Sequence, residues 1–255
     1  MSDRPTRDLP TPEVVLVVVA HPDDAEFEVG ATLAKWSRAG STVHHLVLTD
    51  GSKGTWDRHA DVDALVARRQ HEQRAAREEL GATGEAVFLG EVDGELGTGP
   101  DLRGRVAEVI RRLRPTVVVG HDPWKRYRLH PDHRAAGVLC VDGIVAARDP
   151  FFHPELLAAG LEPHRPDALL LFEADEVNHV EVVGEDDLAA KVRALEAHES
   201  QIETTHLYRV QGEARSGGDP LDAFRARERR RLVDAARAAG VEGMVEAFHL
   251  ERDQL

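Results

Sequence analysis

Two clusters of histidine and aspartate, far apart in this 255-residue chain, are the side chains best suited to chemistry. The first is His21-Pro22-Asp23-Asp24, which follows the apolar run Val14 to Val19. The second is His130-Pro131-Asp132-His133, in the segment after the apolar run Val117 to Gly120. Imidazole and carboxylate ligands together suit a borderline divalent metal ion, and zinc is the first candidate. We therefore interpret the two clusters as two halves of one metal site.

A catalytic zinc ion is held by three protein ligands and keeps one coordination position open. His21 and Asp24, on one tight turn, and His133 from the second cluster supply three candidate ligands. The same residue types suit Fe²⁺ or another divalent ion, so the identity of the metal stays open. Taken alone, the Pro-Asp-Asp turn is also an ordinary N-terminal cap of a helix.

The remaining members of the clusters are candidates for proton transfer. Asp23 and its neighbour Asp24 diverge along the chain, so we expect Asp23 to act as general base on the attacking water rather than as a ligand. We expect His130 on the other side of the substrate, as a cation that stabilises an oxyanion or protonates a leaving amine. Asp132 is expected to hydrogen bond to His130 and keep it protonated, with a helix cap as its alternative role.

Alternating strands and helices must position these residues. Strand-like runs span 14–20, 42–49, 86–89, 117–120 and 168–172, and helix-like runs span 26–39, 63–80, 102–113, 135–147, 186–200 and 224–239. This alternation predicts an α/β, Rossmann-like three-layer fold with a mostly parallel sheet of about five or more strands. Right-handed crossovers place the strand-to-helix loops on one edge, so we expect the active site at the carboxyl ends of the strands.

The length predicts a single domain over residues 1–255. Residues 1–12 are polar and contain three prolines, which favours a flexible N-terminal segment. The part from about residue 150 to 255 is less periodic, and we expect it to pack on the sheet. The longest apolar run near the start is far shorter than the ~20 residues of a membrane helix, and no secretory signal is visible. We therefore expect a cytoplasmic protein with no membrane insertion.

The charge balance narrows the class of partner. Acidic residues number 46 against 32 basic ones, for a formal net charge of −14. Such a surface repels nucleic acid and anionic membranes, because phosphate binding needs a basic stripe. The charge therefore argues against nucleic acid and anionic membranes as partners, and the small-molecule substrate that we expect follows from the candidate metal site instead. It leaves the oligomeric state open, with a homo-oligomer as one alternative.

The two clusters resemble the motifs of the PIG-L/LmbE family of zinc-dependent de-N-acetylases, which includes N-acetylglucosaminyl-conjugate deacetylases of bacterial thiol biosynthesis. The resemblance runs from about residue 14 to 201, in the family's order. Its carrying motifs are Ala20-His21-Pro22-Asp23-Asp24 and His130-Pro131-Asp132-His133; the supporting ones are Leu48-Thr49-Asp50-Gly51, Arg69-Gln70-His71-Glu72 and His198-Glu199-Ser200-Gln201. The resemblance implies the same roles as the residues themselves: zinc on His21, Asp24 and His133, Asp23 as general base, and His130 as acid or oxyanion partner tuned by Asp132.

By the same resemblance, Arg69 and Asp93 are candidates for binding substrate hydroxyls or a phosphate. The alternatives are a solvated helix-face arginine for Arg69 and an ordinary Asp-Gly turn for Asp93. Some family members carry a tyrosine two residues before the first histidine of the second motif, where it can assist the oxyanion. Here Arg128 occupies that position and Tyr127 is next to it, so either residue is a candidate for substrate contact.

These observations predict a metal-dependent hydrolase that removes an acetyl group from an N-acetylglucosamine-type amino sugar conjugate. One alternative is an amidase or tailoring deacetylase that acts on a larger conjugate or a natural product. A non-catalytic metal- or sugar-binding protein is disfavoured, because Asp23 and His130 are needed only for catalysis. A metallophosphoesterase is disfavoured because a single metal is predicted, whereas many such enzymes use two.

Overall fold

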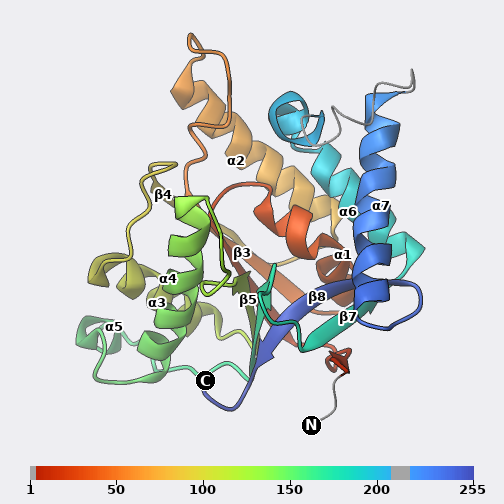
Figure 1. The fold of residues 1–255 in the computed structure, drawn as a ribbon. Helices are drawn as coiled ribbons and strands as arrows, with labels where there is room; N and C mark the ends of the chain where they lie inside the picture. The colour runs from red at the N-terminus through yellow and green to blue at the C-terminus, as the bar shows by residue number, and fades with distance from the viewer. Residues whose placement is uncertain (1–3, 208–218) are drawn as a thin grey trace.

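A single eight-stranded sheet runs through the computed structural model, which describes residues 4–207 and 219–255 (Figure 1). The strand order is β1-β7-β8-β6-β5-β2-β3-β4. Neighbouring strands are parallel, except that β8 runs antiparallel to both β6 and β7. The mostly parallel α/β sheet is therefore confirmed. The strands are β1 (Thr6–Arg7), β2 (Val14–Val19), β3 (Thr42–Thr49), β4 (Ala86–Glu91), β5 (Val117–His121), β6 (Ala168–Phe172), β7 (His179–Val183) and β8 (Met244–Glu251).

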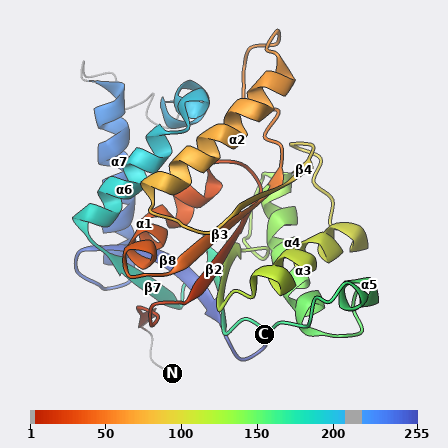
Figure 2. The ribbon, with the colours of Figure 1, turned by 180° about the vertical axis from the view of Figure 1, so that it is seen from behind.

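Helices cover both faces of this sheet, which gives the three layers seen from two sides in Figures 1 and 2. One face carries α1 (Asp24–Arg38), α2 (Val62–Glu79), α6 (Glu185–Glu196) and α7 (Pro220–Ala238). The other carries α3 (Pro100–Leu113), α4 (Pro131–Arg148) and the short α5 (Pro154–Ala158). A 3-10 turn (Glu199–Gln201) and a π-helical segment (Ile202–Leu207) follow α6.

The central strand β2 explains why its sequence is apolar without alternation. Leu16 and Val18 pack toward α3 and α4, whereas Val15 and Val17 pack toward α1. All four side chains are fully buried. A strand that is covered on both faces has no solvent side, so a continuous β-branched run suits it.

The C-terminal part is more regular than its sequence suggested. The described residues from 150 onward, 150–207 and 219–255, contain three strands and three α-helices, and β8 inserts between β6 and β7. The antiparallel β8 escaped prediction because a βα alternation implies parallel strands only. Residues 244–251 also mix apolar residues with glutamates and a histidine, which is a weaker signal than an apolar run.

Within the N-terminal segment, Thr6 and Arg7 form a strand of the sheet, contrary to the expectation of flexibility for residues 1–12; residues 1–3 lie outside the described residues. Strand β1 pairs in parallel with β7. The Leu9 N–H donates to Glu181 Oε1 over 2.7 Å, and Lys35 Nζ lies 2.5 Å from Glu181 Oε2. The His179 Nε2 atom lies 3.0 Å from Glu181 Oε1. A buried carboxylate on β7 thus holds the N-terminal segment, and this tertiary partner is not visible in the local sequence.

The strand order places a topological switch point between β2 and β5. The chain runs from β2 outward to β3 and β4 and then returns to β5 on the other side of β2. Val18 of β2 pairs with Gly120 of β5, so the two strands end side by side. Ligands of open α/β sheets bind at such a point, outside the carboxyl ends of the strands.

No helix among the described residues is both long and apolar enough to span a bilayer.

Replacing Glu181 with alanine tests the buried anchor of the N-terminal segment. The change removes one of the carboxylates that balance the charge of Lys35, and it leaves the Leu9 N–H without its acceptor. We therefore expect the free energy of unfolding to fall by about 3–5 kcal/mol. Urea denaturation measures this loss. The matched control is Glu162→Ala, at an exposed position, which should change stability by less than about 0.5 kcal/mol. Equal stability of the two variants would contradict the anchor.

Candidate active site

The three predicted metal ligands come together where β2 and β5 end. His21 lies on the loop after β2, Asp24 begins α1, and His133 lies in the first turn of α4. The His133 Nε2 atom is 3.3 Å from His21 Nδ1 and 3.3 Å from Asp24 Oδ1. The His21 Nδ1 atom is 3.4 Å from Asp24 Oδ2. Two imidazole nitrogens and one carboxylate therefore face a common point, within 4.8 Å of one another.

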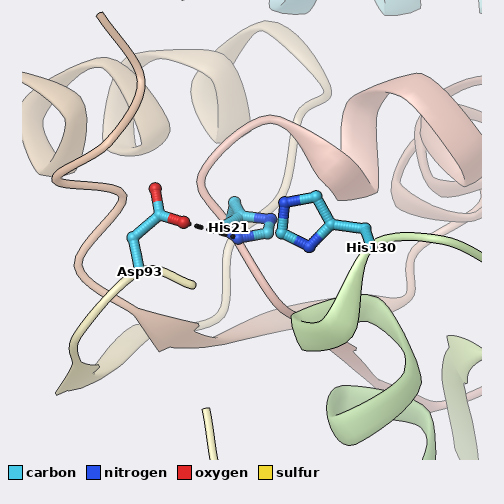
Figure 3. A group of neighbouring side chains, drawn as sticks. All are labelled: His21, Asp93 and His130. Atoms are coloured by element: carbon cyan, nitrogen blue, oxygen red, sulfur yellow. Dashed lines mark ion pairs between the residues drawn. The ribbon is translucent and has the colours of Figure 1, made fainter. Parts of the chain in front are cut away.

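The other nitrogen of His21 belongs to a second, overlapping group. His21 Nε2 lies 3.2 Å from Asp93 Oδ1 and 3.1 Å from Asp132 Oδ2. Figure 3 shows His21 beside both Asp93 and His130, and these three residues also offer ligand atoms within 4.8 Å. A metal-bound histidine commonly gives its second ring N–H to a carboxylate. This preference places the ring proton of His21 on Nε2, which donates to Asp132 and Asp93. It leaves His21 Nδ1 free to bind a metal beside Asp24 and His133.

A third group of candidate ligands consists of His121, His133 and Glu173. The guanidinium cation of Arg128 contacts all three of these side chains. Arg128 Nη1 lies 3.4 Å from His121 Nδ1 and 3.1 Å from His133 Nδ1, and the guanidinium pairs with the Glu173 carboxylate. On its other side, His121 Nε2 lies 3.3 Å from Asp24 Oδ2. Burial lowers the pKa of His121 to about 4, although Asp24 opposes that shift. His121 ends strand β5, which already indicated from the sequence that it lies near the site, whereas Glu173 was not expected there; its one signal is its place directly after β6.

Negative charge collects around His21. Burial opposes the ionisation of Asp132, but hydrogen bonds from His21 and from the backbone N–H groups of Gly94 and Leu96 lower its pKa to about 2. Burial likewise opposes the ionisation of Asp24, but the neighbouring histidines hold its pKa well below its ordinary value. Two ionised carboxylates therefore lie within hydrogen-bond distance of one imidazole ring. This is an environment that attracts a cation.

Asp23 has the surroundings of a base. Its carboxyl is buried, and burial raises its pKa, with a smaller contribution from the charge of Asp24 and an opposing one from Arg69. Arg69 Nη2 lies 3.6 Å from Asp23 Oδ2. Asp23 and His21 both line one cavity of about 360 Å³. A carboxylate with a raised pKa in a cleft is the kind of group that takes up a proton during catalysis.

The second cluster differs from its prediction in two respects. The Asp132 carboxylate bonds to His21 rather than to His130, because Asp132 is fully buried in the first turn of α4 and points toward the loop at Gly94. His130 Nδ1 instead accepts the backbone N–H of Asp132 over 3.3 Å. In a neutral ring the proton then lies on Nε2. Burial, followed by the charges of His21 and His133, lowers the pKa of His130, so the structure favours a neutral hydrogen-bond donor over the expected cation.

The predicted substrate residues fall into two pairs. Arg69 and Asp93 line the cavity, together with Lys53, although Arg69 is only 3% exposed. Arg69 Nη1 donates to the carbonyl of Gly51 over 2.7 Å, and the Asp93 carboxylate accepts the N–H of Lys53 over 3.1 Å. Tyr127 is 93% exposed on the loop before α4, and Arg128 faces His133 instead of the cavity. The cavity is thus lined by the first pair and not by the second.

The sequence profile described as PIG-L, GlcNAc-PI de-N-acetylase, matches residues 16–143. The chain belongs to the PIG-L family. The matched region covers β2 to α4 and therefore both clusters of the site.

Two deacetylases are similar to this chain in sequence. The chain is 37% identical over 189 residues to diacetylchitobiose deacetylase of Thermococcus kodakarensis, covering 74% of this chain and 70% of the relative. It is 35% identical to 1D-myo-inositol 2-acetamido-2-deoxy-alpha-D-glucopyranoside deacetylase of Streptomyces avermitilis, over 61% of this chain and 59% of that protein.

Solved structures show the same fold. N,N'-diacetylchitobiose deacetylase from Pyrococcus horikoshii, in complex with an inhibitor, superposes with a TM-score of 0.81 at 26% identity, covering 94% of this chain and 84% of the other. The 4-carboxy-2-hydroxymuconate hydratase GalB from Pseudomonas putida also superposes, with a TM-score of 0.69 at 21% identity, over 95% of this chain and 97% of that one. Since these names describe different reactions, the fold alone does not identify the chemistry.

Removal of one imidazole tests the three-residue group. His133→Ala deletes a ligand atom that no neighbour replaces at the same point, so we expect zinc affinity to fall by on the order of 100-fold or more, beyond the cost of losing an outer-shell partner. Isothermal titration of the metal-depleted protein measures the affinity. His59→Ala, at an exposed loop position, is the matched control. Unchanged affinity in His133→Ala would remove this residue from the ligand set.

Proposed function

We propose that this protein is a zinc-dependent N-deacetylase that hydrolyses the acetamide of an N-acetylglucosamine-type sugar conjugate, releasing acetate and a free amine. The observation that carries the proposal is the buried carboxylate of Asp23 next to the His21, Asp24 and His133 group, in one cavity with His130. The names of the relatives, which act on diacetylchitobiose and on an N-acetylglucosaminyl inositol, support this substrate class. We further propose that the sheet from Thr6 to Glu251 forms one deacetylase domain.

The donor set suits the metal. Two neutral imidazole nitrogens and one carboxylate oxygen match a catalytic zinc site with an open position, and they also accept Fe²⁺. The atoms of Asp24 and His21 that would not bind the metal have hydrogen-bond partners. Asp24 Oδ2 accepts the backbone N–H of His21 over 2.8 Å, and His21 Nε2 faces Asp132. When bound there, zinc would polarise the acetyl carbonyl and make water acidic enough to react near neutral pH.

The side chains of the chain would handle the protons. Asp23 takes a proton from the attacking water and passes it to the amide nitrogen as the carbon–nitrogen bond breaks. His130 donates a hydrogen bond from Nε2 to the oxyanion that forms at the carbonyl carbon. Asp132, through its bond to His21, orients that ligand and keeps its ring in one tautomer. None of these proposed roles requires His130 to be charged.

The cavity favours one sugar ring at the reacting end. A volume of about 360 Å³ lies near the lower end of the range for ligand pockets, roughly 300–1,000 Å³. We propose that Arg69 and Asp93 contact sugar hydroxyls in the cavity wall. We propose that Tyr127, exposed on the loop before α4, contacts the rest of the conjugate, since an aromatic ring offers both an apolar face and a hydroxyl. Arg128 would act on the site only through His133 and Glu173.

A larger conjugate is the second candidate substrate. Trp56, Trp124 and Tyr127 are more than half exposed, and they belong to the loops after β3 and β5 that border the site. Such a rim favours a substrate that extends beyond the cavity, as in a tailoring deacetylase or an amidase. The identity of the substrate therefore needs a direct assay.

The first experiment compares zinc-loaded protein with a chelated control on N-acetylglucosamine, diacetylchitobiose and an N-acetylglucosaminyl inositol, with released acetate as the readout. We expect acetate from at least one of these substrates and none after chelation. Acetate that persists after complete metal removal would contradict the metal dependence. The absence of acetate from all three, with stoichiometric zinc bound, would contradict the substrate class.

A substitution at Asp23 tests the proposed base. Asp23→Asn keeps the size of the side chain but cannot accept the proton, so we expect kcat to fall by roughly 10²–10⁴-fold while zinc still binds. Steady-state kinetics and metal analysis of the same preparation measure both quantities. The control is Asp63→Asn, exposed at the start of α2. Wild-type turnover in Asp23→Asn would exclude Asp23 as the base.

A further inference from the structure

The backbone of Asp23 has an unusual conformation. Its φ is 100° and its ψ is −24°, in the left-handed region that side-chain-bearing residues rarely adopt. Residues persist in such conformations only where the surrounding structure over-determines them, and they are concentrated at functional sites.

Two side chains of α2 form hydrogen bonds with the peptide group that joins Pro22 to Asp23. Arg69 Nη2 donates to the Pro22 carbonyl over 2.7 Å. On the opposite edge of the same peptide, the Asp23 N–H donates to Gln73 Oε1 over 3.0 Å. Arg69 and Gln73 are four residues apart on one helix, so they present their side chains on the same face. Because both polar atoms of the peptide are held, the plane of the peptide is held as well.

The amide of Gln73 has its own orientation set from behind. Gln73 Nε2 donates to Glu26 Oε1 over 2.7 Å. An ionised carboxylate only accepts hydrogen bonds, so the amide nitrogen of Gln73 must face Glu26 and its oxygen must face Asp23. The second oxygen of Glu26 lies 3.3 Å from His198 Nε2. Gln73, Glu26 and His198 are all 0% exposed, so water does not compete for these contacts.

From this geometry we infer that Arg69 and Gln73 are positioning residues for the hydrolysis, and that Glu26 and His198 support them. By fixing the Pro22–Asp23 peptide they fix the direction in which the Asp23 side chain leaves the backbone. The carboxylate is thereby aimed at the cavity beside His21. This inference rests on the proposed function, because it takes Asp23 to be the base. It gives a physical role to Gln73 and Glu26, and to the His198 motif.

The direct test replaces Gln73 with methionine, which keeps the length of the side chain and removes the acceptor for the Asp23 N–H. A base displaced by a fraction of an ångström loses rate rather than binding, so we expect kcat to fall by on the order of 10- to 100-fold, with KM and zinc affinity within about twofold of wild type. The matched control is Gln70→Met on the same helix, which should keep wild-type kcat. Equal kcat in the two variants would overturn the inference, as would a loss confined to KM or to zinc affinity.

An exchange of the two buried partners separates positioning from general damage to the core. Gln73→Glu alone sets two carboxylates against each other with no donor between them, so we expect low kcat. In the double variant Gln73→Glu/Glu26→Gln, the amide donates to the carboxylate in the reverse sense, and a carboxylate oxygen again accepts the Asp23 N–H. We expect the double variant to regain most of the kcat that Gln73→Glu loses. A double variant no better than Gln73→Glu would contradict the role of the hydrogen-bond chain.

Amide hydrogen exchange provides a readout that does not depend on turnover. In zinc-loaded protein, we expect the Asp23 amide to exchange about tenfold or more faster in Gln73→Met than in Gln70→Met, because its acceptor is gone. Equal exchange in the two variants would overturn the inference whatever the activity. If the wild-type protein deacetylates none of the sugars while the exchange rates differ as expected, the proposed function fails and the grip on the peptide stands.

Discussion

The site depends on the imidazole of His21, whose two nitrogens face two different sets of groups. Nδ1 faces Asp24 and His133, and Nε2 faces Asp93 and Asp132. Because the ring is buried and its carboxylate neighbours carry lowered pKa values, charge must be balanced within the cluster rather than by water. A divalent cation on the Nδ1 side, as proposed, would supply that balance. It would also leave the Nε2 proton for the carboxylates of Asp93 and Asp132.

The sheet supplies the framework for this cluster. The central strand β2 delivers His21 and the two aspartates, and β5 next to it delivers the loop that leads to His130 and His133. Helix α2, from the opposite layer to α4, reaches over both the Pro22–Asp23 peptide and the loop at Gly51. The reacting groups therefore sit on loop ends, but each is tied to a buried helix or strand. This matches the general need for a rigid support around groups that must be placed to within a fraction of an ångström.

The sequence allowed the layers, the five strands flanking the site and the two histidine–aspartate clusters to be predicted, because each of these features is local in the chain; the ligand roles stay predictions. A buried strand is a continuous apolar run, and a cluster such as His-Pro-Asp-His is visible as it stands. The partner of Asp132 was not predictable in this way. Whether its carboxylate meets His130 or His21 depends on how α4 starts and where the loop at Gly94 lies. The same holds for Arg128, which turns inward to His133 and Glu173, and for the Glu181 anchor that draws residues 6–9 into the sheet.

Anomalous diffraction from zinc-loaded crystals, measured at the zinc edge, shows directly on which side of His21 the metal binds. We expect one strong peak within about 2.0–2.2 Å of His21 Nδ1, His133 Nε2 and the Asp24 carboxylate. A peak coordinated by His21 Nε2, Asp93 and His130 would contradict this expectation, because Asp93 would then be a metal ligand instead of a hydrogen-bond partner of His21. A peak among His121, His133 and Glu173, with Arg128 displaced, would contradict it equally.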